Sequence, residues 1–223
     1  MSPTHRGPRW SSSGGGGAEG EVSPLTVNRL SLYLRALNHL REQGILRISS
    51  QDLARRYRFS AALIRKDLAQ FGEFGIRGVG YDVVPLAERI AGLLGLERAH
   101  TIVICGVGNL GSALARYWGF NHGNFRVVAG IDTDPQKVGR RIGSFTVGHP
   151  RDLKRLVRES GAEIGVLAVP ESAATENYLA LIAAGIRAVI NFAPIRLEPN
   201  ADVRVKNVDL RINLEEVAFF LSH

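Results

Sequence analysis

The chain has 223 residues, of which 45% are hydrophobic, and it carries a formal net charge of +7. This length can bury two modest cores. The single cysteine, Cys105, excludes an intramolecular disulfide and a cysteine-rich metal site. No stretch approaches the roughly 18 apolar residues of a membrane span, and the N-terminus lacks the hydrophobic segment of a signal peptide. We therefore expect a cytoplasmic protein with no membrane partner and no metal.

The positive charge is concentrated toward the N-terminus. Residues 25–95 contain eleven basic and six acidic residues, whereas the charges nearly balance from residue 96 onward. This asymmetry favours a polyanion as partner, and a solvated basic face is the alternative. Residues 1–24 are rich in glycine, serine and proline and have no apolar periodicity, so they are predicted to form a disordered tail.

Residues 25–95 have the pattern of a helix-turn-helix. Leucines recur at helical spacing between residues 30 and 40, and Gly44 follows as a stop. Ser49 and Asp52 have the spacing of a capping box at the start of a second helix. Ser60 can cap a third helix after a tight turn. Three short helices in this arrangement predict a helix-turn-helix.

The segment after the third helix completes a winged-helix DNA-binding domain. The glycines of "FGIRGVGYDV" suit a β-hairpin wing, and Pro85 sits where the first residue of a linker helix is expected. In the third helix Leu63, Leu68 and Phe71 are expected to face inward. Arginine and glutamine are common readers of base edges and phosphates. The residues expected to bind DNA are Arg55, Arg56, Arg58, Ser60, Arg65, Lys66, Gln70 and Arg77. A basic three-helix bundle that binds protein is the alternative.

Residues 96–212 alternate short apolar runs with amphipathic segments. The runs "TIVICGV", "FRVVAGID", "EIGVLAV" and "RAVINFA" predict strands, and "DVRVKNVDL" can add one more. Such alternation predicts an α/β domain with a Rossmann-type parallel sheet. The last segment, 213–223, is predicted to be a helix capped by Asn213. Its apolar residues favour a role in dimerisation.

A glycine-rich turn follows the first strand of this domain. Gly106 permits a tight turn, Gly108 lets the backbone approach a pyrophosphate, and Gly111 lets helix and strand pack closely. Asp132 ends the second strand, where a carboxylate accepts hydrogen bonds from the adenosine ribose and disfavours a 2′-phosphate. The turn residues predicted to bind the cofactor are Gly106, Val107, Gly108, Asn109, Leu110 and Gly111. The preferred cofactor is NADH or NAD⁺.

The sequence offers no convincing catalyst. None of the six histidines has an acid partner, and few residues remain after Asp132 to form a substrate domain. The alternatives that stay open are an NAD-dependent oxidoreductase with a basic appendage and a regulator that responds to CoA.

Several strings together resemble one family. "RLSLYLRAL", "IRKDLAQFGEFGIRGVGY", "GVGNLGSALARYWGF", "NFAP" and "NVDL" occur in the order and spacing of the Rex family of redox-sensing transcriptional repressors. The resemblance covers the chain from about residue 25 to its C-terminus. It implies a homodimer with an N-terminal winged helix, a Rossmann domain and a C-terminal helix exchanged between subunits.

The resemblance also implies a mechanism and residue roles. NADH rearranges the dimer and releases operator DNA, whereas NAD⁺ competes without releasing it. Arg65 and Lys66 match the recognition-helix pair of the family. Phe192, Ala193 and Pro194 match a loop that lines the nicotinamide pocket. Arg35, Tyr117 and Asp209 match the family residues that form a redox relay between the two domains. The resemblance places Tyr117 near the nicotinamide.

Overall fold

The chain divides into two compact units, at residues 1–98 and 99–223. The computed structural model describes residues 22–76 and 78–222. Nearly all of the predicted tail, and Arg77 with its predicted DNA contact, lie outside the described residues. Within the described residues, no helix combines the length and hydropathy needed to cross a membrane.

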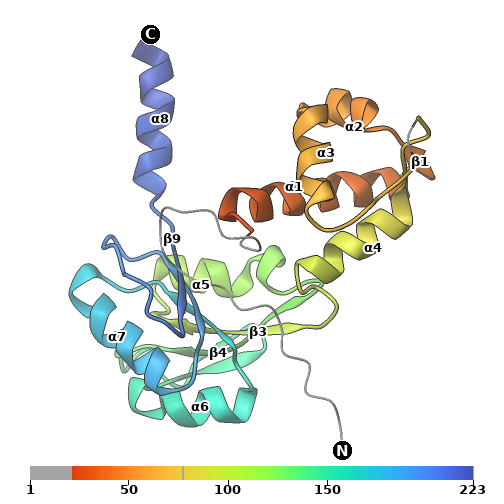
Figure 1. Cartoon of the computed structure of the whole chain (residues 1–223). Helices are drawn as coiled ribbons and strands as arrows, with labels where there is room; N and C mark the ends of the chain where they lie inside the picture. The colour runs from red at the N-terminus through yellow and green to blue at the C-terminus, as the bar shows by residue number, and fades with distance from the viewer. Residues whose placement is uncertain (1–21, 77, 223) are drawn as a thin grey trace, which may run out of the picture. The chain divides into compact units, whose positions relative to one another are not determined.

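The described part of the N-terminal unit contains four helices and two short strands (Figure 1). The elements are α1 (Pro24–Glu42), β1 (Arg47–Ile48), α2 (Ser50–Tyr57), α3 (Ala61–Ala69), β2 (Tyr81–Asp82) and α4 (Val83–Leu93). The predicted caps are confirmed. The Ser49 hydroxyl accepts a hydrogen bond from the Asp52 amide, and the Ser60 hydroxyl accepts one from the Leu63 amide. The helix-turn-helix is formed by α2 and α3.

One hydrophobic core joins all four helices of this unit. Leu37 of α1, Ile64 of α3 and Ile90 of α4 are completely buried in it. Helix α4 is therefore part of the N-terminal unit and not only a linker. In α3 the buried residues are Ile64, Asp67 and Leu68, so the inward position predicted for Leu68 is confirmed, whereas Leu63 is half-buried. Pro85 was predicted to begin α4 but is its third residue, which the first turn tolerates because the amide there has no helical partner.

The predicted hairpin wing is confirmed only in part, by an antiparallel bridge within the loop. Strand β2 pairs antiparallel with β1, with Ile48 opposite Tyr81, and the loop before β2 has a single bridge between Ile76 and Gly80. Gly80 has φ +100°, and a Cβ there would lie 2.5 Å from the carbonyl oxygen of Ile48. Only glycine fits this approach, so the wing is a glycine-rich loop held against the strand that follows α1.

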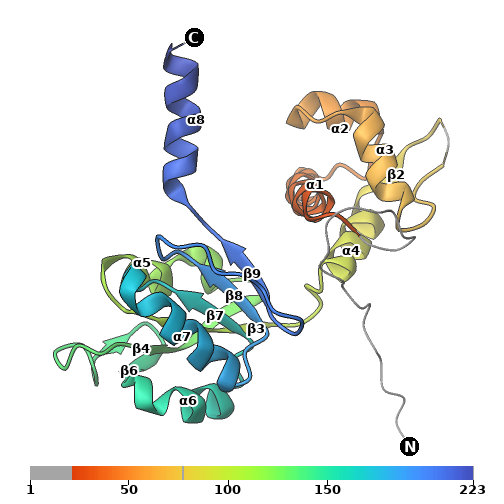
Figure 2. The same cartoon turned by 60° about the vertical axis from the view of Figure 1, so that its left-hand side comes forward.

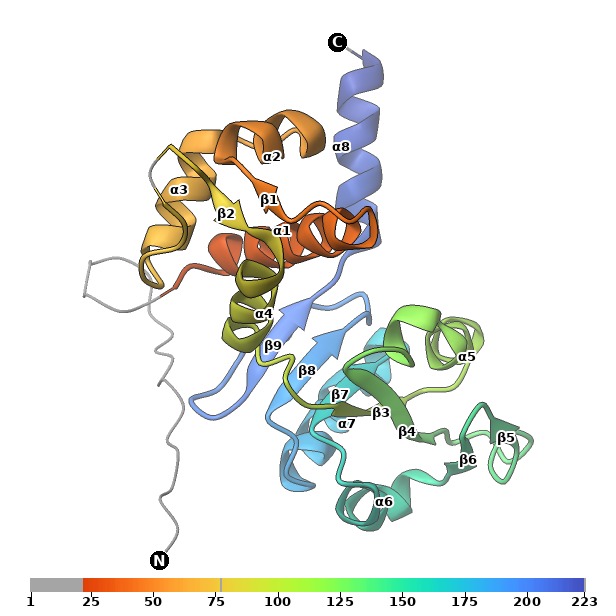
Figure 3. The ribbon, with the colours of Figure 1, turned by 90° about the vertical axis from the view of Figure 1, so that its right-hand side faces the viewer.

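The C-terminal unit is a seven-stranded sheet flanked by helices. Its elements are β3 (His100–Cys105), α5 (Asn109–Arg116), β4 (Phe125–Ile131), β5 (Arg141–Ile142), β6 (Phe145–Gly148), α6 (Leu153–Ser160), β7 (Ile164–Leu167), α7 (Glu171–Ala183), β8 (Ala188–Asn191), β9 (Arg204–Asn207) and α8 (Leu210–Ser222). Figure 3 shows the strand order β5-β6-β4-β3-β7-β8-β9. All neighbours pair in parallel except β5 with β6.

The predicted Rossmann-type fold is confirmed. The order β6-β4-β3-β7-β8-β9 is that of a doubly wound dinucleotide-binding sheet, whose switch point lies between β3 and β7. Helices α6 and α7 cover one face, and α5 covers part of the other (Figures 1 and 2). Strand β9 confirms the additional strand predicted from "DVRVKNVDL", whereas β5 and β6 were not predicted.

Helix α8 begins at Leu210, three residues before the predicted cap. Asp209 is the capping residue, because its Oδ1 accepts a hydrogen bond from the Arg211 amide at 2.9 Å. Asn213 lies inside the helix and donates its side-chain amide to the carbonyl of Asp209, so the predicted Asn213 cap is wrong. None of the described residues of α8 is buried. Its exposed apolar residues are Leu210, Ile212, Leu214, Val217, Phe219, Phe220 and Leu221.

Candidate functional site

The glycine turn connects β3 to α5 and is constrained by its own backbone. Gly106 has φ +86°, and a Cβ there would lie 2.5 Å from the carbonyl oxygen of Ala168. A Cβ on Gly111 would overlap the carbonyl oxygen of Gly106. A Cβ on Gly108, in contrast, would meet no atom within 4 Å. The first and third glycines therefore serve the fold, and the edge at Gly108 is open to a ligand.

A cavity of about 480 Å³ lies at the carboxyl ends of β3, β4 and β7. Gly106 and Gly108 line it from the turn, and Asp132 lines it from the end of β4. This is the switch point at which open α/β sheets bind their ligands. The N-terminus of α5 adds the free amides and positive dipole end that favour a pyrophosphate.

Asp132 is buried and fixes the turn to β4. Its Oδ2 accepts hydrogen bonds from the Val107 amide at 2.8 Å and from Lys137 Nζ at 3.2 Å, and its Oδ1 accepts one from the Asp134 amide at 2.9 Å. Burial opposes ionisation, but these hydrogen bonds outweigh it and lower the pKa of Asp132. The carboxylate therefore carries its charge where a ribose phosphate would approach.

Lys137 is a residue of this site that the sequence analysis missed. Its ammonium lies 3.2 Å from Asp132 and 3.5 Å from Asp134, and the hydrogen bond to Asp132 raises the pKa of Lys137. A lysine five residues beyond the acidic end of a strand was the available signal. Asn109 and Leu110 open α5, as predicted, with Leu110 exposed.

The predicted nicotinamide loop follows β8. Phe192 is half-buried, Ala193 is buried and Pro194 is exposed. The loop is held by the buried Asn191, which accepts a hydrogen bond from the Ala193 amide at 3.0 Å and donates to Asn207 at 2.9 Å. The amide pair of Asn191 and Asn207 was missed because each residue completes its bonds only when β8 and β9 lie side by side.

The three residues of the predicted relay lie in different units of the chain. The Tyr117 ring is exposed and packs edge-on against Phe120. The Asp209 carboxylate caps α8. Arg35 is exposed on α1, in the other unit. Because Arg35 belongs to one unit and Tyr117 and Asp209 to the other, the relay stays a prediction.

Cys105 ends β3 and is completely buried. Burial raises the pKa of its thiol to about 12, so the reactive thiolate is scarce at neutral pH. We expect hydrogen peroxide to leave the DNA affinity of the wild type and of Cys105→Ala equal, measured by fluorescence anisotropy. Loss of affinity in the oxidised wild type alone would contradict this expectation and identify Cys105 as a redox sensor.

The predicted DNA-binding residues lie on α2, on α3 and in the turn between them. Arg55 pairs with Asp52 at 3.0 Å. Arg58 adopts φ +57°, the only non-glycine among the described residues with positive φ, and so forms the tight turn into α3. The other described residues of this set are placed as follows: Arg56 lies in the last turn of α2, Ser60 caps the N-terminus of α3, Arg65 and Lys66 are exposed on α3, and Gln70 caps its C-terminus.

A buried ion pair anchors the recognition helix, and sequence analysis missed it. Asp67 of α3 is 1% exposed and accepts hydrogen bonds from Arg29 Nε at 2.6 Å, Arg29 Nη2 at 2.7 Å and the Tyr33 hydroxyl at 2.9 Å. Arg29 and Tyr33 belong to α1. The sequence contained one indication of this pair. Asp67 follows Ile64 by three residues, which places its carboxylate on the apolar face of α3, where a charged group needs a partner.

A winged helix joined to a dinucleotide-type sheet defines the class of ligand-responsive DNA-binding regulators. Comparisons with known families agree with this division. Residues 21–69 match the family described as "Putative DNA-binding protein N-terminus", and residues 97–195 match the family described as "CoA binding domain".

Curated relatives extend the match to almost the whole chain. A redox-sensing transcriptional repressor Rex from Carboxydothermus hydrogenoformans is 42% identical over 89% of this chain and 96% of its own length. The Rex of Desulforamulus reducens is 43% identical over 91% of this chain and 96% of its own length. The Rex of Streptomyces coelicolor is 44% identical over 89% of this chain and 77% of its own length.

Solved structures agree. The Rex-family repressor RSP in complex with β-NAD⁺ and operator DNA has a TM-score of 0.86 and 34% identity, covering 91% of this chain and 93% of that chain. RSP in complex with β-NADH has a TM-score of 0.80 and 33% identity, covering 90% and 94%. The chain therefore belongs to the Rex family of redox-sensing transcriptional repressors, which confirms the resemblance in its sequence.

Proposed function

We propose that the chain represses transcription by binding operator DNA as a homodimer and that NADH releases it, so that repression follows the ratio of NADH to NAD⁺. The observation that carries the proposal is the open Gly108 edge of the turn beside an ionised Asp132, in a chain that also has an exposed recognition helix. The first feature suits an adenine dinucleotide without a 2′-phosphate, and the second suits DNA.

Discrimination between the two redox forms must occur at the nicotinamide. NADH and NAD⁺ differ there by one hydride and one positive charge, whereas the adenosine end contributes affinity to both. A ligand shifts a two-state equilibrium only by its differential affinity for the states. We infer from the resemblance that the loop Phe192–Pro194 lines the nicotinamide pocket, and that Tyr117, Arg35 and Asp209 relay its state to the DNA-binding domain.

The homodimer is supported by α8. A thirteen-residue helix with seven large apolar side chains exposed requires a partner surface. Part of the sheet face on the α5 side is also incompletely covered, since Ile190 and Phe192 there are only half-buried. We propose that α8 is exchanged between the two subunits and that the dimer acts in the cytoplasm, where its operator lies.

We propose no enzymatic activity. A hydride-transfer enzyme needs a positioned acid or base near the cofactor. Among the described residues that line the cavity, the titratable side chains are Asp132, Asp134 and Lys137, and these are already paired with one another. Detectable oxidation of NADH with simple carbonyl acceptors would contradict this part of the proposal.

CoA is a second candidate ligand, because residues 97–195 match the family described as "CoA binding domain". CoA carries a phosphate on its adenosine ribose, and the ionised Asp132 disfavours a phosphate nearby. The ammonium of Lys137 offers only partial compensation, since it is already paired with Asp132.

A titration of purified protein on a palindromic Rex-type operator tests the proposal. Fluorescence anisotropy at fixed salt is measured with NADH, NAD⁺ or CoA added. Release by NADH, but not by NAD⁺ or CoA, is expected. Release by CoA at concentrations where NADH has no effect would favour the second candidate.

Replacing Asp132 with alanine should weaken NADH binding at least about tenfold and reduce the preference for NADH over NADPH. The reason is twofold: the ribose loses an acceptor, and the Val107 amide loses the bond that fixes the turn. Calorimetric titration with both nucleotides measures the effect. Asp202→Ala, an exposed change in the same unit, is the control. Unchanged affinity of Asp132→Ala for both nucleotides would remove Asp132 from the site.

A further inference from the structure

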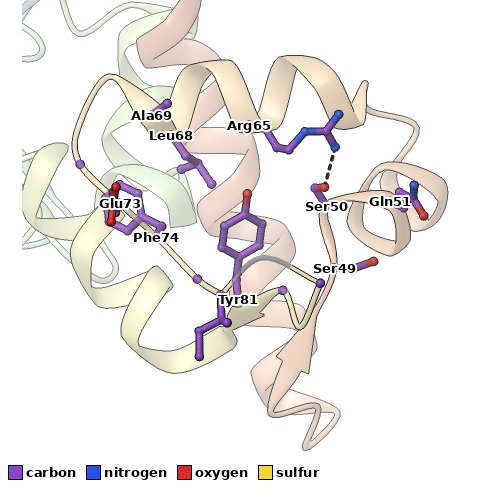
Figure 4. Close-up of a pocket in the computed structure, with 14 residues that line it drawn as sticks. Ser49, Ser50, Gln51, Arg65, Leu68, Ala69, Glu73, Phe74 and Tyr81 are labelled. Atoms are coloured by element: carbon purple, nitrogen blue, oxygen red, sulfur yellow. Dashed lines mark hydrogen bonds between the residues drawn. The ribbon is translucent and has the colours of Figure 1, made fainter.

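A second cavity, of about 990 Å³, lies within the DNA-binding unit. Figure 4 shows that it is enclosed by the start of α2, one side of α3 and the glycine-rich loop that leads into β2. The cavity therefore borders both the recognition helix and the wing. Among the polar residues that line it, only Arg65 was predicted to bind DNA.

Tyr81 contributes an unpartnered hydroxyl to this cavity. The residue is 8% exposed, and its ring belongs to the core of the unit. Its hydroxyl points into the cavity, between Leu68 and Ser50 (Figure 4), and has no hydrogen-bond partner among the described residues. Burial raises the pKa of Tyr81, an effect that the charge of Arg65 only partly offsets, so the hydroxyl keeps its proton. Because no buried side-chain oxygen of the described residues lacks a hydrogen-bond partner, this hydroxyl is reached from the cavity and can donate to a ligand there.

Arg65 and the start of α2 supply positive charge on the same side. Arg65 Nη1 donates to the Ser50 hydroxyl at 2.9 Å, which holds the guanidinium beside the first turn of α2 (Figure 4). The Ser49 hydroxyl already caps the Asp52 amide. The amides of Ser50 and Gln51 are the first two of the helix and have no acceptor within it. Arg65, the Tyr81 hydroxyl and these two amides therefore direct hydrogen-bond donors toward the same end of the cavity.

The neighbouring carboxylates leave this positive charge uncancelled. Asp52 accepts hydrogen bonds from Ser49 at 2.7 Å and pairs with Arg55 at 3.0 Å, so it is already neutralised. Asp82 pairs with Arg47. Glu73 lines the opposite end of the cavity, beside Phe74 (Figure 4). An anion is therefore favoured at the end formed by Arg65, Ser50 and Tyr81.

We propose that Tyr81, Arg65 and the first turn of α2 bind one phosphodiester of the operator backbone, at the phosphate that flanks the recognition helix. The inference rests on the proposed DNA-binding function and deepens it. A phosphate has three or more acceptor positions and a negative charge, which matches the donors present. Arg65 then serves as a backbone clamp, and base contacts fall to Lys66 and Gln70 on the adjoining face of α3.

The test combines Tyr81→Phe with a series of operator duplexes, each carrying one methylphosphonate in place of a backbone phosphate. Tyr81→Phe removes only the hydroxyl and keeps the buried ring. We expect it to weaken operator binding about tenfold, and to weaken binding of unrelated duplex DNA by a similar factor, since a backbone contact carries no sequence information. At one phosphate in each half-site the methylphosphonate should weaken the wild type more than it weakens Tyr81→Phe, because the variant has already lost one of the contacts to that phosphate but keeps those of Arg65 and α2.

The matched control is Tyr57→Phe, whose hydroxyl donates to the Ala36 carbonyl inside the same unit. It should bind every duplex as the wild type does. If the losses in binding free energy caused by Tyr81→Phe and by the methylphosphonate are additive at every backbone position, Tyr81 contacts none of those phosphates and the proposal is overturned. Saturable binding of inorganic phosphate by the wild type, lost in Tyr81→Phe, with no coupling to any backbone position, would also overturn it, because that result assigns the site to a free anion.

The wild type itself separates this proposal from the proposed function. Equal affinity for operator and unrelated duplex would contradict the repressor function, while the methylphosphonate coupling could still support the phosphate site. Operator binding that responds to NADH, with no methylphosphonate coupling at Tyr81, would support the repressor and overturn the phosphate site.

Discussion

Gly108→Ala should leave the sheet domain folded and remove most of its affinity for NADH. A Cβ at position 108 meets no protein atom within 4 Å, but it projects from the turn where the pyrophosphate must approach the backbone. We expect a loss of at least about a hundredfold in NADH affinity, which corresponds to about 2.7 kcal/mol of binding free energy. Calorimetric titration and the thermal melting temperature are measured together.

The same variant should bind operator DNA normally and resist release by NADH. The DNA-binding residues lie in the other unit and are unchanged. The NADH concentration needed for half-release should rise by the factor that the affinity loses, because the ligand acts only through its binding free energy. Normal release of Gly108→Ala by NADH would show that the dinucleotide does not use this turn.

Gly111→Ala is the contrasting variant. Its Cβ would overlap the carbonyl of Gly106 within the protein, so the helix and strand must separate. We expect a lower melting temperature as well as lost NADH binding. If Gly108→Ala melts as early as Gly111→Ala, its lost affinity reflects unfolding, and the explanation by ligand overlap is wrong.

These glycines illustrate which features a sequence can predict. The turn, the Ser49 and Ser60 caps and the alternating strands depend on residues that are neighbours in the chain, so their spacing was sufficient. Strand β1 has only two residues and no periodicity, and its partner Tyr81–Asp82 lies more than thirty residues away. The wing was therefore assigned to a local hairpin. The start of α8 was misplaced because no core selects the capping residue of an exposed helix.

The candidate sites divide in the same way. The glycine turn and Asp132 were predicted because a strand, a turn and a second strand end in known order. Lys137 and the pair of Asn191 and Asn207 required the sheet to be assembled first. The cavity at Tyr81 required β2 to pair with β1 and the wing loop to fold back on α3. A tyrosine beside a glycine carries no such signal in the sequence.

Asp67→Asn should cost the DNA-binding unit about 2–4 kcal/mol in free energy of unfolding, since removing one member of a buried ion pair leaves the other uncompensated. Arg29 would keep its charge in a site where its side chain is only 26% exposed, and Tyr33 would lose a charged acceptor. Hydrogen exchange of the slowest amides of α3 measures this free energy for the unit itself.

The surface pair of Arg47 and Asp82 provides the control. Its nitrogen–oxygen distance is also 2.6 Å, but the two side chains are 60% and 53% exposed. We expect Asp82→Asn to cost less than about 1 kcal/mol, because solvent screens an exposed pair. Equal costs for the two variants would show that burial of Asp67 adds nothing, and would contradict the anchoring role of the pair.

The pH dependence of Asp67 follows from the sign of its pKa shift. Burial opposes ionisation, but the hydrogen bonds from Arg29 and Tyr33 outweigh it and lower the pKa of Asp67 in the folded state. Its contribution to stability is therefore complete above the unfolded value of about 3.9 and is lost as the pH falls through the lower folded value. The stability difference between wild type and Asp67→Asn should be constant near neutral pH and shrink below about pH 4. If the stability difference instead grows on acidification, the Asp67 carboxyl takes up its proton more readily in the folded protein than in the unfolded chain. Arg29 would then not stabilise the ionised form of Asp67.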